Sequence, residues 1–173
     1  MRALLGTWRS FPRDARVFLA GGLGLELGHA FLWVLQNLYV RSLGFGEAAA
    51  GTVLAASGVG VVISTIPAAA LYDSLGPRRC LMLSAAGAAL ALVGLASVET
   101  LPTLMLFSAL QGAAFTVHRV VAAPFIVSVS RPTQRTQMFG AEFMTHTVAS
   151  TVGLACAGLV ANALVVRGLS ETA

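Results

Sequence analysis

Two ionisable residues of opposite charge lie deep inside long apolar stretches of the sequence. Glu26 falls within the run 17–40, and Arg119 falls within the run 103–129. At 1.5 Å of rise per helical residue, both lie about 4 Å from the centre of their runs. Charged groups are rare inside membrane helices and by default face a bundle interior or a cavity. We therefore expect Glu26 and Arg119 to face each other or a shared polar cavity, with a purely structural ion pair as the alternative.

Further polar residues in the same two runs could line such a cavity. Those of the first run recur at helical spacing and form one stripe, which consists of Glu26, His29, Trp33, Gln36 and Asn37. In the run 103–129, Gln111 and His118 accompany Arg119. A histidine in the middle of a span is an available proton carrier, although an imidazole that only packs between helices is the simpler interpretation. The stripe predicts a cavity or substrate pathway.

Other arrangements could carry different chemistry. Glu142 and His146 are four residues apart, share a helix face and can pair, either as a gate contact or, more simply, at the membrane interface. Ser57 and the three histidines offer the elements of an intramembrane hydrolase, but no Gly-x-Ser-Gly string accompanies them. No metal-ligand spacing and no phosphate-binding glycine loop is present. The sequence predicts neither an enzyme nor a bound metal or cofactor.

The composition indicates which elements must position these residues. Hydrophobic residues make up 57% of the 173 residues and charged residues 10%, and the mean hydropathy is +0.82. A soluble domain carries roughly 25% charged residues. Each crossing needs about 20 apolar residues, and the sequence offers five such runs: 17–40, 48–71, 80–98, 103–129 and 138–166. We expect an all-α, polytopic bundle of about five transmembrane helices over 17–166, a basic N-terminal segment 1–16 and a tail 167–173.

The arginines indicate the orientation. All 11 basic residues are arginine, and the net charge is +4. Eight of them lie in the N-terminal segment and the second and fourth links: Arg2, Arg9, Arg13, Arg16, Arg78, Arg79, Arg131 and Arg135. Because they flank apolar runs, they favour lipid head groups over a nucleic acid as partner. The positive-inside rule then predicts a multi-pass protein of the cell membrane with a cytoplasmic N-terminus.

The link after the second run carries a motif. Its residues 69–79 read Ala-Ala-Leu-Tyr-Asp-Ser-Leu-Gly-Pro-Arg-Arg. This stretch resembles Gly-x-x-x-Asp-Arg-x-Gly-Arg-Arg-Arg, the signature between helices 2 and 3 of the major facilitator superfamily. Matching positions are Asp73, Gly76, Arg78 and Arg79, and departing positions are Ala69, Ser74 and Pro77. Gln111-Gly112 resembles the end of the family's fourth-helix pattern Arg-x-x-Gln-Gly, with Ser108 at the arginine position.

The resemblance implies a secondary active transporter that works by alternating access, with a small-molecule substrate and an ion or proton as coupling partner. In the family, the loop acid latches the two halves, and the substrate pathway runs beside helices 1 and 4. Because members typically have two six-helix halves, we expect an incomplete N-terminal half that needs the missing half or a partner chain to transport. The alternatives are a non-transporting membrane scaffold and a truncated product.

Small residues repeat every four positions in the last run. The repeat consists of Thr145, Ala149, Gly153, Ala157 and Ala161. This spacing lets helix backbones approach closely. The sequence predicts a tightly packed helix here, and the resemblance adds that family helices 2 and 5 face the other half of the transporter.

Overall fold

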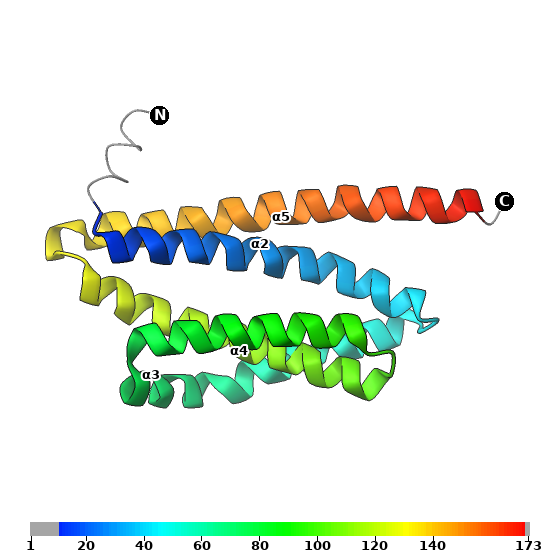
Figure 1. Cartoon of the computed structure of the whole chain (residues 1–173), viewed down its shortest axis with the longest axis horizontal. Helices are drawn as coiled ribbons and strands as arrows, with labels where there is room; N and C mark the ends of the chain where they lie inside the picture. Colours follow the sequence, from blue (N-terminus) through cyan, green and yellow to red (C-terminus); the bar gives the residue numbers. More distant parts are fainter. Residues whose placement is uncertain (1–10, 172–173) are drawn as a thin grey trace. The chain divides into compact units, whose positions relative to one another are not determined.

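The computed structural model describes residues 11–171, with side chains up to residue 163, and this part of the chain is all-α (Figure 1). It contains four long helices: α2 (Arg13–Ser42), α3 (Glu47–Ser97), α4 (Leu101–Val129) and α5 (Arg135–Glu171). A short 3₁₀ helix, η1 (Pro132–Gln134), precedes α5. All four long helices are long and apolar enough to cross a membrane. Residues 1–10 of the expected basic segment, and the side chains of the expected tail, lie outside the described residues.

The structure has four long helices instead of the expected five, because two of the expected runs belong to one kinked helix. The runs 48–71 and 80–98 are not separated by a loop but form two arms of the single helix α3. Only Gly76 departs from helical geometry inside it, with φ 75° and ψ 167°. Pro77 follows directly and suits the first position of the second arm, where its missing N–H has no helical partner to lose. Figure 1 shows α3 reversing its direction partway along.

Gly76 occupies a backbone conformation that is essentially restricted to glycine. Gly76→Ala should therefore lower the free energy of unfolding by about 1–2 kcal/mol through backbone strain alone. An added Cβ would meet no atom within 4 Å, so steric overlap makes no contribution. Thermal unfolding in detergent measures the effect, and Gly51→Ala is the control because Gly51 is helical and has equal space. Equal stability of the two variants would contradict this account of the kink.

The chain divides into two compact units. The first consists of residues up to Leu38 together with those from Ile126 onward, and so holds most of α2, the end of α4 and α5. The second, Tyr39–Phe125, holds α3 and most of α4.

In the first unit, the small-residue face of α5 packs against α2. A Cβ built on Gly153 would lie 2.7 Å from the Cβ of Ala30 and 3.2 Å from the carbonyl oxygen of Leu27. Ala149 and Ala157, one turn to either side, are almost completely buried. The predicted close approach therefore occurs within this chain. Along this contact α2 and α5 run in the same direction (Figure 1).

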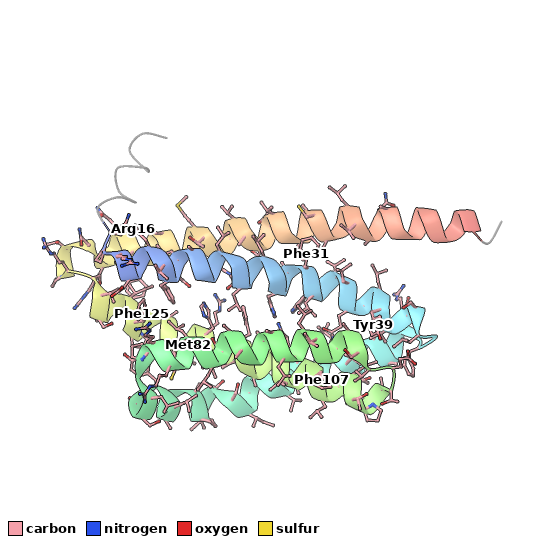
Figure 2. The ribbon with its side chains drawn as sticks, viewed as in Figure 1. Arg16, Phe31, Tyr39, Met82, Phe107 and Phe125 are labelled. Atoms are coloured by element: carbon pink, nitrogen blue, oxygen red, sulfur yellow. The ribbon has the colours of Figure 1, made fainter. Side chains whose placement is uncertain are left out.

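In the second unit, α4 packs closely against both arms of α3. The Ser108 hydroxyl on α4 donates a hydrogen bond to the Val53 carbonyl on the first arm, at 2.7 Å, and is fully buried. On the second arm, a Cβ at Gly94 would overlap the ring of Phe107, which Figure 2 labels on α4. The Tyr39 hydroxyl donates to the Val98 carbonyl at 3.1 Å and ties the end of α2 to the end of α3.

Candidate functional site

A carboxylate and an imidazole meet between the two long helices of the first unit. Oε2 of Glu26 on α2 lies 2.8 Å from Nδ1 of His146 on α5. The residue Glu26 is only 5% exposed, whereas the side chain of His146 is 29% exposed. Nδ1 makes no hydrogen bond of regular geometry, and the contact is an ion pair while the imidazole is protonated. Opposite charges at this distance attract strongly wherever water is excluded.

This pair combines the two side chains most suited to holding a proton inside a membrane. A carboxylate can accept a proton and a protonated imidazole can release one. The packing of α5 on α2 positions both groups, because Gly153 and Ala149 let the helix backbones approach one another. Glu26 stands thirteen residues after the start of α2 and His146 eleven after the start of α5. Since both helices begin at the same end (Figure 1), the two side chains reach similar depth.

The rest of the predicted stripe follows α2 beyond Glu26. The rings of His29 and Trp33 are 6.2 Å apart at an interplanar angle of 59°, a tilted contact. Trp33 and Asn37 are exposed, and His29 and Gln36 are partly buried. The structure brings His29 and Trp33 together, and the role of the whole stripe as a cavity lining stays a prediction.

The polar residues of α4 differ in their surroundings. Gln111 is 5% exposed and directly precedes Gly112, which packs against α3. Arg119 is exposed, and its guanidinium carbon lies 5.6 Å from the centre of the Phe115 ring, a cation–π contact. His118 is partly buried beside it. Glu26 belongs to the first unit and Arg119 to the second, so their pairing stays a prediction.

The residues of the loop motif surround the kink of α3. Asp73 precedes Gly76 within the first arm, while Arg78 and Arg79 begin the second, and all three charged side chains are exposed. Because these three side chains are exposed, another helix can contact them, which is what a latch requires.

Glu142 lies one turn before His146 on α5 and is partly buried. Their predicted pairing is untested, and the structure places another carboxylate, that of Glu26, beside His146, which the spacing rule did not suggest. The signal available in the sequence was equal depth: both residues stand about three turns after arginine-rich helix starts.

The structure also describes the surroundings of possible metal ligands and of Ser57. Within the described residues, no group of three histidine, cysteine or acidic side chains could hold a metal ion. Ser57 packs against α4, because a Cβ on Gly112 would overlap its backbone carbonyl and approach its hydroxyl.

Comparison with known proteins agrees with the motif. The family model described as Major Facilitator Superfamily matches residues 18–169, which is most of the chain. A comparison with curated proteins found no match.

Proposed function

The chain belongs to the major facilitator superfamily, whose members are typically multi-pass membrane transporters and not enzymes, and on that premise we propose a proton-coupled secondary transporter in which Glu26 and His146 carry the proton. The observation that carries this proposal is a carboxylate, 5% exposed, held 2.8 Å from an imidazole inside two apolar helices. Ionisable groups at such depth are costly, so they indicate an ion or substrate pathway.

The substrate is a small molecule that enters beside the polar face of α2. His29, Trp33 and Gln36 supply an aromatic ring and polar atoms in the two turns beyond Glu26. Arg119, Gln111 and His118 on α4 are the further polar residues that we propose for the substrate pathway. Alternating access then exposes the proton-carrying pair to one side of the membrane at a time.

Transport requires further helices. Members of the family combine two halves around a substrate site near the bilayer midplane, and we propose that a second half, in the same or a partner chain, completes the pathway. Asp73, Arg78 and Arg79 then act as the latch of the cytoplasmic gate, which their exposure supports. The arginine distribution supports a cytoplasmic N-terminus in the cell membrane.

Thiol labelling tests whether the pathway is wet. In a background of Cys80→Ala and Cys156→Ala, cysteine is introduced singly at Glu26, His29 and Gln36. Each protein is then treated in membranes with a charged, membrane-impermeant methanethiosulfonate. We expect labelling at His29→Cys and Gln36→Cys at least about tenfold faster than at Val152→Cys, because a charged reagent reaches thiols only through water. Val152 is 47% exposed on α5, lies outside the polar residues of the proposed pathway and serves as the control.

Loop positions calibrate the experiment and report the orientation. In intact cells, Ser42→Cys should react from outside, whereas Thr133→Cys, in η1, should react only after permeabilisation. Protection of all three pathway positions, with normal labelling of Ser42→Cys, would favour a non-transporting scaffold in which the polar groups only fasten helices together.

A further inference from the structure

A basic cluster gathers where the first unit begins its two long helices. Arg13 and Arg16 stand in the first turn of α2, and Arg131 and Arg135 flank η1 at the start of α5. Figure 2 labels Arg16 at this end, and Figure 1 shows both helix starts there. Asp14 is the acid among these positions. Both helices also direct the positive end of their dipole this way, which adds to the field of the arginines.

Two polar atoms in this cluster lack partners among the described residues. Ser130, which precedes Arg131, is 9% exposed, and its hydroxyl makes no hydrogen bond. Nε of Arg16 is likewise buried without a hydrogen bond. Buried polar atoms are nearly always satisfied by protein, water or a ligand. A hydroxyl and a guanidinium N–H are both donors toward an anion.

We propose that this cluster, made of Arg13, Arg16, Ser130, Arg131 and Arg135, binds the phosphate of an anionic phospholipid. Guanidinium groups match phosphate oxygens with paired hydrogen bonds, and Arg131 and Arg135 are exposed and available. The site is independent of the proposed proton pathway, since neither Glu26 nor His146 takes part.

Apolar side chains next to the cluster select a lipid over free phosphate. Val17, directly after Arg16, is 64% exposed. Phe139 and Phe143, one and two turns beyond Arg135, are 38% and 66% exposed. A head group held by the arginines would lay its acyl chains along these side chains. Free phosphate would leave them uncovered.

Native mass spectrometry of the protein released from mixed micelles tests the proposal. With equal phosphatidylglycerol and phosphatidylcholine, we expect retained phosphatidylglycerol to dominate. Arg16→Gln with Arg131→Gln should weaken its apparent affinity by about fivefold for each charge removed. Arg78→Gln with Arg79→Gln, the charge-matched control on α3, should retain it. Ser130→Ala should produce a smaller loss without changing the charge.

The wild-type protein provides a second test, which does not depend on how any variant folds. Raising the salt concentration should release phosphatidylglycerol and leave phosphatidylcholine unchanged, because screening weakens exposed charge pairs. Equal retention of both lipids would overturn the proposal. So would equal losses in the two double variants, or displacement of phosphatidylglycerol by a similar concentration of inorganic phosphate.

Discussion

Gly60→Val should lower the free energy of unfolding by about 3 kcal/mol, the upper end of the usual cost of overpacking. A Cβ at Gly60, on the first arm of α3, would overlap the carbonyl oxygen of Ala109 on α4. The obstacle is backbone, so it cannot rotate away as a side chain would. The expected shift of the thermal midpoint in detergent is roughly 6–12 °C downward.

Gly58→Val is the matched control on the same helix. Gly58 is exposed and has no atom within 4 Å of its Cβ position, so valine should leave the midpoint unchanged or raise it slightly through better helix propensity. Gly112→Val should behave like Gly60→Val, because the Cβ of residue 112 would overlap the Ser57 carbonyl from the opposite side of the same contact. Similar midpoints for Gly60→Val and Gly58→Val would show that the two helices separate at little cost.

This contact also gives a physical reason for the departure from the family's fourth-helix pattern. Ser108 occupies the arginine position of that pattern, is completely buried and donates to the Val53 carbonyl on α3. An arginine there would have to displace the first arm of α3. The sequence revealed the substitution but not its cause, since the cause depends on which helices touch.

The fold class and the family were predictable because they depend on local sequence. An apolar run of 20 residues is sufficient to indicate a span, and the family match over residues 18–169 confirms the recognition that began with the motif around Asp73. The number of helices was not predictable. Gly76-Pro77 indicates a loop, yet a single glycine with φ 75° reverses α3 without one.

The partner of Glu26 illustrates a second limit. Sequence reasoning matched its charge with Arg119, a pairing that stays a prediction, but it did not suggest the contact with His146. Periodicity assigns a residue to a helix face but does not say which helix packs there. The approach of α5 to α2 at Gly153 decides that question within the first unit and brings His146 to the carboxylate. A histidine was easily overlooked, because its charge depends on its protonation.

His146→Ala should lower the free energy of unfolding by about 3 kcal/mol, the lower end of the range for breaking a buried ion pair. Its imidazole is partly exposed, so water screens some of the attraction, whereas Glu26 is 5% exposed. Removing the imidazole takes away a partner that lies 2.8 Å from the carboxylate and that attracts it when protonated. Thermal unfolding of the purified protein in detergent measures the loss. Glu142→Gln, one turn earlier on α5, is the control and should change stability little.

Adding Glu26→Gln to His146→Ala should then restore part of the lost stability. Glutamine keeps the shape of the side chain but removes the charge that the first substitution left without its imidazole, so the double variant should be more stable than His146→Ala alone. A contact that served only for packing would give no such recovery, because glutamine keeps the shape of the side chain and leaves the lost packing unchanged. Whether Glu26→Gln raises the stability of the His146→Ala variant therefore distinguishes a charge-carrying pair from a contact that only packs the two helices. A charge-carrying pair is what the proposed proton coupling requires.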